Sequence, residues 1–179
     1  MGIVFIHFTM SLDGFISKPD GMDIAWMFKY GGDDEMAERL MGEIGAVVLG
    51  NKDFREGTVT EDSLPYGGMK VPQFVVTHHA REPVTIGPLT FTFVTDGIEQ
   101  TIKLAKEAAG DKWVALLGAS IAQQCLKAGL VDEIVVNLAP ILLGDGISLF
   151  DRLGSEYELK LEEAVTAGQV TTHRFSVVR

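Results

Sequence analysis

Four short segments of the chain place polar side chains at or directly after the end of a predicted buried strand, and three of them contain glycine. They are residues 10–14, 50–54, 77–79 and 118–121. Ligands of open α/β sheets bind outside the carboxyl ends of the strands, and glycine lets the backbone approach a ligand closely. Residues 118–121 also begin a predicted helix, whose unpaired N–H groups and dipole favour a phosphate. Taken alone, this last segment favours the simpler interpretation of a tight strand-to-helix turn.

Other catalytic patterns are missing from the sequence. It contains no G-x-S-x-G elbow, no Walker A loop and no G-x-G-x-x-G fingerprint. His78 and His79 are adjacent, and neighbours in a strand point to opposite faces. The single cysteine, Cys125, falls in an apolar helical pattern that predicts a buried, unreactive thiol. We therefore expect no metal site.

The composition is that of a globular protein with a negative net charge. The chain has 179 residues, 46% of them hydrophobic, and a formal net charge of −10. That charge disfavours nucleic-acid binding, which needs clustered Lys and Arg. No apolar run reaches the roughly 20 residues that cross a bilayer, and the N-terminus lacks the features of a signal peptide. We expect one cytoplasmic domain spanning residues 1–179, with no membrane association.

Hydrophobic periodicity predicts an α/β fold with a mixed sheet. Predicted helices cover residues 33–43, 98–109 and 119–128. Predicted strands cover residues 3–9, 45–50, 73–77, 91–95, 113–117 and 133–139. Two long alternating segments, 157–165 and 169–178, end the chain and predict an antiparallel hairpin.

Four stretches of sequence resemble the dihydrofolate-reductase-like family, in its branch containing the reductase domain of bifunctional riboflavin-biosynthesis deaminase–reductases and their stand-alone relatives. They are MSLDGFI (10–16), GAVVLGNKDF (45–54), FVVTHHAREP (74–83) and GASIAQQCLKAGLVDEIVVNLAPILLGDGISLF (118–150). The resemblance covers nearly the whole chain. It implies a mixed, mostly parallel sheet flanked by helices, with an antiparallel C-terminal hairpin. It also implies NADPH-dependent hydride transfer to a small pyrimidine- or pteridine-like heterocycle.

By position, the resemblance assigns cofactor-binding residues to the strand ends. The nicotinamide would be flanked by Thr9 and Ile16. The phosphate and ribose region would be held by Gly50, Asn51, Lys52 and Asp53. Thr77 and His78 would contact the adenine–ribose end of NADPH. The pyrophosphate would be cradled by Leu117, Gly118, Ala119, Ser120 and Ile121.

Two residues depart from the family pattern. Asn51 stands where the family usually has an arginine, which binds phosphate with a permanent charge and a bidentate geometry. Leu117 stands in place of the first glycine of a Gly-Gly pair, where a side chain adds crowding. Both departures bear on NADPH affinity and on the preference for NADPH over NADH.

Candidates for the substrate side each have a structural alternative. Asp13 is the catalytic candidate, because it lies at the end of the first strand, but an Asp-Gly turn explains it equally well. Trp26 would stack on a heterocycle or anchor the core, and the core interpretation is favoured. Asn137 would face the substrate or make a structural hydrogen bond.

Dihydrofolate reductases use a carboxylate on the first helix to help protonate the pterin. Asp33, Asp34 and Glu35 lie near that position, although helix capping explains them more simply. Two alternatives to the reductase remain open: a nucleotide-binding module that has lost turnover, and a true dihydrofolate reductase. The family also makes a homodimer plausible.

Overall fold

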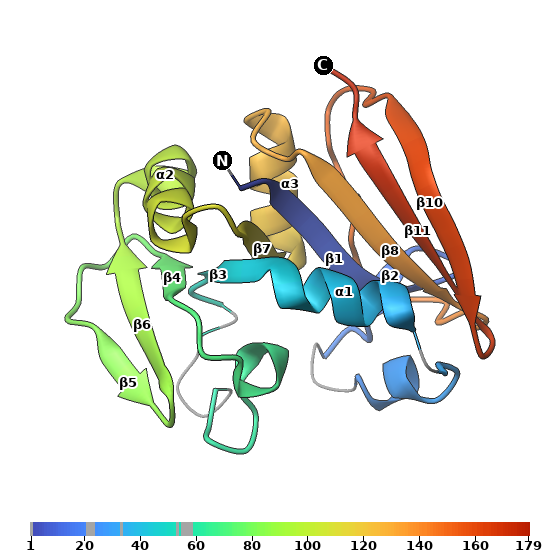
Figure 1. Cartoon of the computed structure of the whole chain (residues 1–179), viewed down its shortest axis with the longest axis horizontal. Coiled ribbons are helices and arrows are strands. Elements are labelled where there is room, and N and C mark those ends of the chain that lie inside the picture. The colour runs from blue at the N-terminus through green and yellow to red at the C-terminus, as the bar shows by residue number, and fades with distance from the viewer. Residues whose placement is uncertain (1, 21–23, 33, 53, 55–58) are drawn as a thin grey trace. The chain divides into compact units, whose positions relative to one another are not determined.

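The computed structural model describes residues 2–20, 24–32, 34–52, 54 and 59–179 (Figure 1). The chain divides into two compact units, each built from two separate segments. Unit 1 comprises Met1–Val4 and Glu43–Leu130, and unit 2 comprises Phe5–Gly42 and Val131–Arg179. No helix formed by the described residues is long and apolar enough to cross a membrane.

Unit 1 contains a mostly parallel sheet. Its strands, in spatial order, are β7 (Trp113–Leu117), β3 (Ile44–Gly50), β4 (Gln73–Val76), β6 (Leu89–Val94) and β5 (Val84–Ile86). The first four are parallel to one another, and β5 is antiparallel to β6. The other elements are the 3₁₀ helix η2 (Pro65–Gly68), α2 (Gly97–Ala109) and α3 (Ala119–Lys127).

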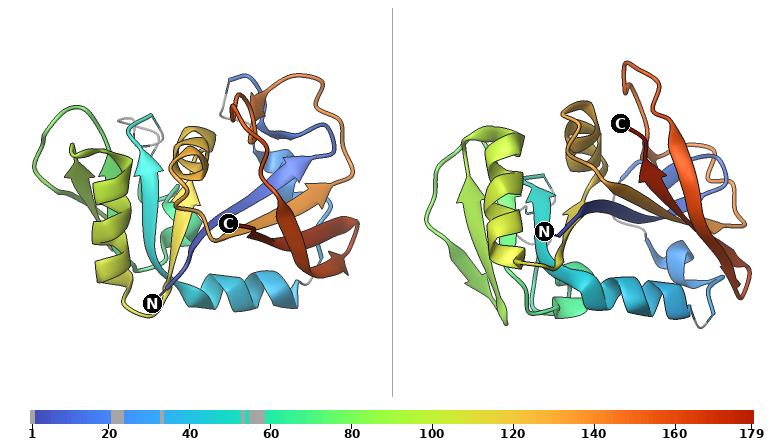
Figure 2. Two further views of the ribbon diagram at one scale, coloured as in Figure 1. Left: turned by 90° about the horizontal axis from the view of Figure 1, so that it is seen from above. Right: turned by 45° about the horizontal axis from the view of Figure 1, so that its top comes forward.

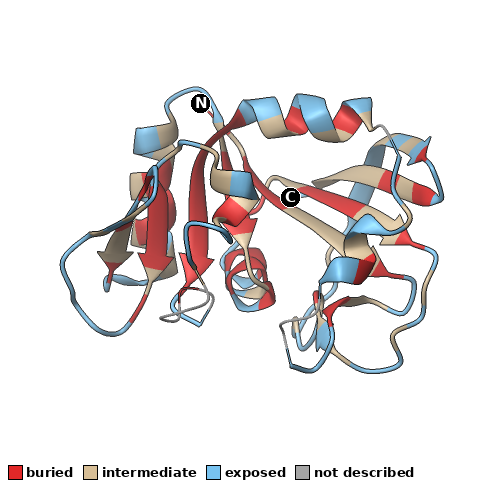
Figure 3. Ribbon diagram, turned by 90° about the horizontal axis from the view of Figure 1, so that it is seen from below, coloured by how far each residue is buried: buried red, intermediate tan, exposed pale blue. Residues whose placement is uncertain are grey.

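Strand β3 is the centre of the unit 1 core. All seven of its residues are buried, because α2 and α3 both pack against it and parallel strands lie on each side. Such a strand has no solvent-facing side, which explains its continuous apolar sequence IGAVVLG. Figure 3 shows the strands of this unit as largely buried.

A Leu49→Ala variant is expected to lose about 2–5 kcal/mol of unfolding free energy, because Leu49 is fully buried and the smaller side chain leaves a cavity. Urea titration followed by circular dichroism measures this loss. Leu12→Ala is the control, since Leu12 is 67% exposed, and it should change stability by less than about 0.5 kcal/mol. Equal stabilities for the two variants would contradict the assignment of Leu49 to the core.

Unit 2 contains a mixed sheet. Its strands, in spatial order, are β10 (Leu159–Ala167), β11 (Val170–Val177), β8 (Glu133–Ala139) and β1 (Val4–Ser11). Strands β1 and β8 are parallel, whereas β11 is antiparallel to both β8 and β10. A separate two-stranded sheet pairs β2 (Phe15–Ser17) with β9 (Ile147–Ser148). The hairpin of β10 and β11 is the long twisted ribbon of Figure 2.

Helix α1 (Glu35–Glu43) begins where Asp34 caps it. The Asp34 Oδ1 atom accepts a hydrogen bond from the Ala37 N–H at 3.0 Å, which satisfies one of the free donors of the first turn. Leu40 is buried, and Arg39 on the exposed side lies 2.6 Å from Glu163 of β10. Buried and exposed residues alternate along this helix in Figure 3.

The predicted fold class is confirmed: the molecule has mixed, mostly parallel strands, flanking helices and an antiparallel C-terminal hairpin. The six predicted strands and three predicted helices all form, with ends shifted by a few residues. Helix 33–43 starts later than predicted because Asp34 is its cap, and Asp33 lies outside the described residues. The sequence analysis missed β2, β5 and β9, which are only two or three residues long.

Candidate functional site

Unit 1 brings three of the four predicted segments to one edge of its sheet. In the parallel register, Leu49 lies opposite Leu117 and Gly50 lies opposite Val76, so β7, β3 and β4 end side by side. The Asn51 N–H extends the ladder by donating to the Val76 carbonyl at 3.1 Å. Figure 2 shows β3 and β7 running in the same direction. Residues 50–52, 77–79 and 118–121 therefore follow neighbouring strand ends.

The start of α3 offers backbone donors at this edge. Gly118 precedes the helix with φ +95°, a conformation that favours glycine, and no side chain caps the helix. The Ala122 N–H closes the first turn on the Gly118 carbonyl, so the N–H groups of residues 119–121 have no partner within the helix. The exposed Ser120 Oγ accepts from Gln124 Nε2 at 3.1 Å. The peptide bond between Leu117 and Gly118 is trans.

Polar residues also follow β3 and β4 at this end of the unit 1 sheet. Asn51, Lys52 and His78 are exposed, whereas Thr77 is buried and its Oγ1 atom accepts the His79 N–H at 3.1 Å. Thr77 therefore shapes the turn and leaves the histidine side chains on the surface. The predicted cofactor residue Asp53 lies outside the described residues.

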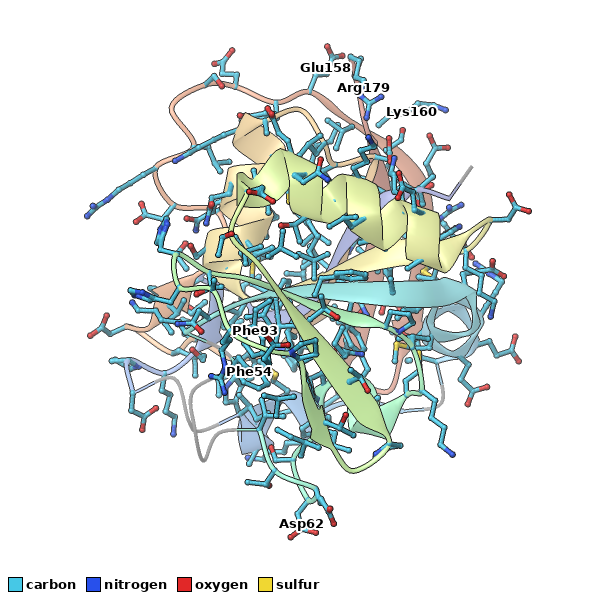
Figure 4. The ribbon with its side chains drawn as sticks, turned by 90° about the vertical axis from the view of Figure 1, so that its left-hand side faces the viewer. Phe54, Asp62, Phe93, Glu158, Lys160 and Arg179 are labelled. Atoms are coloured by element: carbon cyan, nitrogen blue, oxygen red, sulfur yellow. The ribbon has the colours of Figure 1, made fainter. Side chains whose placement is uncertain are left out.

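Arg81 belongs to the same region, and the sequence analysis did not select it. Its guanidinium carbon lies 4.5 Å from the ring centroid of Phe93 and 5.7 Å from that of Phe54. The two rings pack edge to face, 5.0 Å apart, and Figure 4 shows them together. One signal was available, because Arg81 is the only arginine in the four stretches that carry the family resemblance.

Unit 2 contains a polar cluster of His7, Thr9, Asp34, Asn137 and Thr172. The Asn137 side-chain amide lies 3.2 Å from His7 Nε2 and 3.4 Å from Thr9 Oγ1. The Thr172 Oγ1 atom lies 3.0 Å from Asn137 Oδ1 and 2.8 Å from Asp34 Oδ2. The cluster thus links the cap of α1 to three strands.

Strand register explains why these residues meet. Thr9 on β1 lies opposite Asn137 on β8, which in turn lies opposite Thr172 on β11. His7 shares the Thr9 side of β1, because alternate residues of a strand face the same way. The sequence analysis selected Thr9 and Asn137 but missed His7 and Thr172.

Hydrogen counting assigns donors and acceptors in the cluster. The Thr172 hydroxyl has one proton and two acceptors within reach, and the carboxylate of Asp34 is the stronger and closer acceptor. The Asn137 Nδ2 group is a donor, so the facing His7 Nε2 atom accepts and the imidazole is neutral. Burial lowers the pKa of His7, while the charge of Asp34 acts in the opposite direction.

A His7→Gln variant is expected to lose less stability than the wild type on acidification. Because burial lowers the pKa of folded His7, the unfolded chain takes up this proton first, near pH 6.5. The stability that His7 contributes is complete above that pH and falls below it. Between pH 7.5 and 5.5, the wild type should lose up to about 1.4 kcal/mol more than the variant. Urea unfolding at both pH values measures this difference, and equal losses would contradict a neutral His7 with a lowered pKa.

Asp13, the predicted catalytic residue, makes three hydrogen bonds within unit 2. Its Oδ1 atom accepts from Ser11 Oγ at 2.6 Å and from the Leu143 N–H at 3.1 Å, while Oδ2 accepts from the Gly144 N–H at 2.8 Å. The Ser11 hydrogen bond is the main cause of its lowered pKa. These contacts tie the turn after β1 to the loop after β8, which is the structural alternative. A catalytic role for Asp13 stays a prediction.

Trp26 and Ile16 are both buried in unit 2. Trp26 lies on the 3₁₀ helix η1 (Ala25–Phe28) and is 7% exposed, which favours the core interpretation. Ile16 is buried on β2. Ile16 and Thr9 fall in unit 2, whereas the other described residues predicted to bind the cofactor fall in unit 1. Among the residues that the structure describes, no three His, Cys, Asp or Glu side chains gather as metal ligands would.

An apolar cavity of about 270 Å³ lies on the opposite face of the unit 2 sheet. His173 and Phe175 line it, and their side chains point away from Thr172 because residues alternate along β11. None of the five residues of the polar cluster lines this cavity. The polar cluster and the cavity are therefore separate features.

Comparisons with known proteins concern the family and the fold of the chain. The family model of the RibD C-terminal domain matches residues 3–172. The uncharacterized protein YwjB of Bacillus subtilis is 27% identical over 166 residues, covering 92% of this chain and 91% of that protein.

Two solved structures show the same fold. One, from Shewanella sp. PV-4, is described as a riboflavin biosynthesis protein; it is 24% identical, has a TM-score of 0.81, and 99% of each chain is covered. The other is a diaminohydroxyphosphoribosylaminopyrimidine deaminase/5-amino-6-(5-phosphoribosylamino)uracil reductase of Thermotoga maritima. It is 13% identical with a TM-score of 0.69, covering 99% of this chain and 57% of that one. The chain belongs to the RibD C-terminal domain family.

Proposed function

We propose that this protein is an NADPH-dependent reductase that transfers a hydride to a small pyrimidine- or pteridine-like heterocycle. The observation that carries the proposal is the row of strand ends in unit 1, where β7, β3 and β4 end in register and α3 begins directly after β7. Membership of the RibD C-terminal domain family supports it.

The residues of the unit 1 edge fit a dinucleotide phosphate. The N–H groups of residues 119–121, which have no partner within the helix, and the positive end of the α3 dipole would hold the pyrophosphate. Gly118 would let the backbone approach closely, and Thr77 and His78 would lie toward the ribose. The cofactor would supply the hydride, and the protein would orient it and exclude water.

Asp34 is the best candidate for the substrate side. Its carboxylate has about four lone-pair positions, and contacts with Ala37 and Thr172 use two of them. Asp34 is partly exposed, so the remaining positions can accept N–H groups of a heterocycle. The Thr172 hydroxyl donates to Oδ2 of the carboxylate and so restrains its orientation.

Titration of the pure protein with NADPH, followed by nicotinamide fluorescence, tests the first step of this proposal. Saturable binding at micromolar concentrations is expected, and no binding at millimolar NADPH would overturn it. NADPH oxidation in the presence of dihydropterins and ribosylaminopyrimidines then tests turnover and identifies the substrate class.

A nucleotide-binding module without turnover is the second candidate, and Asn51 and Leu117 favour it. Asn51 gives the exposed turn after β3 no permanent charge, and Leu117 places a side chain beside Gly118. This candidate predicts NADPH binding without NADPH oxidation across the substrate panel. Steady oxidation with any member of the panel excludes it.

A true dihydrofolate reductase is the third candidate, and Asp34 favours it. The carboxylate precedes the first helix and contacts a threonine hydroxyl on a neighbouring strand. This candidate predicts methotrexate-sensitive reduction of dihydrofolate. Absence of that activity in a protein that binds NADPH excludes it.

A further inference from the structure

Arg81 differs from the other arginines that the structure describes. Four of them lie within 4 Å of a carboxylate, in the pairs Arg39–Glu163, Arg152–Asp151, Arg174–Glu133 and Arg179–Asp132. Arg81 is exposed and pairs with no carboxylate among the described residues; its contacts are with the rings of Phe54 and Phe93. In a chain of net charge −10, such a cation is available for an anionic ligand.

The two rings fix the position of the guanidinium. Phe54 follows β3 and is 5% exposed, and Phe93 lies on β6, so both rings belong to the packed part of unit 1. Stacking occupies a face of the guanidinium and leaves the N–H donors on its edge for other partners. Figure 4 shows the two rings that form this platform.

The site lies where β3 and β4 end. Phe54 closes the turn of Asn51 and Lys52, and Arg81 follows the turn of Thr77 and His78. Lys52, His78 and His79 are exposed nearby in sequence, with Glu82 as the neighbouring acid. This end of unit 1 therefore lacks an arginine at position 51 but has one, Arg81, in the segment between β4 and β5.

We propose that Arg81 binds the 2′-phosphate of NADPH and sets the preference for NADPH over NADH. This inference rests on the proposed reductase function. The two cofactors differ only in that phosphate, which is dianionic near neutral pH and suits the paired N–H donors of a guanidinium. Arg81 thereby takes over, from the β4 side, the contact that Asn51 cannot make.

The test measures the dissociation constants of NADPH, NADH and adenosine 2′,5′-bisphosphate by calorimetry, for wild type and four variants. Arg81→Gln is expected to weaken the binding of NADPH and of the bisphosphate by about ten- to a hundredfold, which is the usual contribution of charged hydrogen bonds. The affinity for NADH should not change. Arg81→Lys keeps the charge but loses the paired N–H donors of the guanidinium. Its affinity for NADPH should therefore lie between those of the wild type and Arg81→Gln. Lys103→Gln removes an exposed charge on α2 and should change nothing.

Arg55→Gln tests the rival arginine, which lies outside the described residues. Unchanged NADH affinity and unfolding temperature show that each variant is folded. Failure of the wild type to bind NADPH overturns the reductase proposal itself. A wild type that binds both cofactors equally, an Arg81→Gln variant that keeps the NADPH preference, or loss of the preference in Arg55→Gln instead overturns only the assignment of Arg81.

Discussion

An Asp34→Asn variant is expected to lose about 10²- to 10⁴-fold in kcat, the usual contribution of a group that positions or transfers a proton. Asparagine has nearly the same size and is as good a helix cap as aspartate, so α1 should keep its start. The hydrogen bond from Thr172 would also find an oxygen. What disappears is the negative charge at the cluster that joins Asp34, Thr172 and Asn137.

NADPH affinity separates a chemical role of Asp34 from a structural one. The variant should bind NADPH as the wild type does, because the predicted phosphate contacts belong to unit 1. Asp96→Asn is the matched control, since Asp96 stands at the cap position of α2 but makes no side-chain cap hydrogen bond. A kcat for Asp34→Asn within threefold of the control would remove Asp34 from the proposed site.

Gly118→Ala is expected to weaken NADPH binding by at least about a hundredfold, through loss of one or two charge-assisted hydrogen bonds. The backbone of Gly118 has φ +95°, where a side chain is strained by roughly 1–3 kcal/mol. Relief of that strain turns the peptide that precedes α3, and the N–H groups of its first turn lose their common direction.

Gly110→Ala controls for the strain, because Gly110 has φ +63° at the end of α2 in the same unit. Both variants should lose similar stability in urea unfolding, but only Gly118→Ala should lose NADPH affinity. If the two bind NADPH equally well, the start of α3 is not the phosphate site, and the turn exists only to join a strand to a helix.

Much of the fold could be predicted because its signals are local. Strand β3 is a continuous apolar run because both of its faces are covered, and α2 shows helical periodicity that stops at Gly110. The short strand β5 could not be predicted, since three residues carry too little pattern and its pairing with β6 defines it. Its existence depends on a neighbour rather than on its own sequence.

Some residues of the candidate site could likewise be predicted from local sequence, and others could not. Residues 118–121 were predicted because a strand, a glycine and a helix follow one another in the sequence. His7, Asn137 and Thr172 meet only through the register of three strands, which no local pattern encodes. Asp34 caps α1, as one interpretation predicted, and its other oxygen accepts from Thr172; its role toward a substrate stays a prediction. Arg81 was missed because its aromatic partners come from other elements.

The division of each unit into two chain segments has a kinetic consequence. In unit 2, Phe5 of β1 must find Glu133 of β8, and all of the second segment of unit 1 lies between them. Closing so long a loop costs entropy before any contact repays it, and such non-local pairing slows folding. The polar cluster is therefore expected to assemble late. During synthesis, β1 cannot pair with β8 until the ribosome has made residues 133–139.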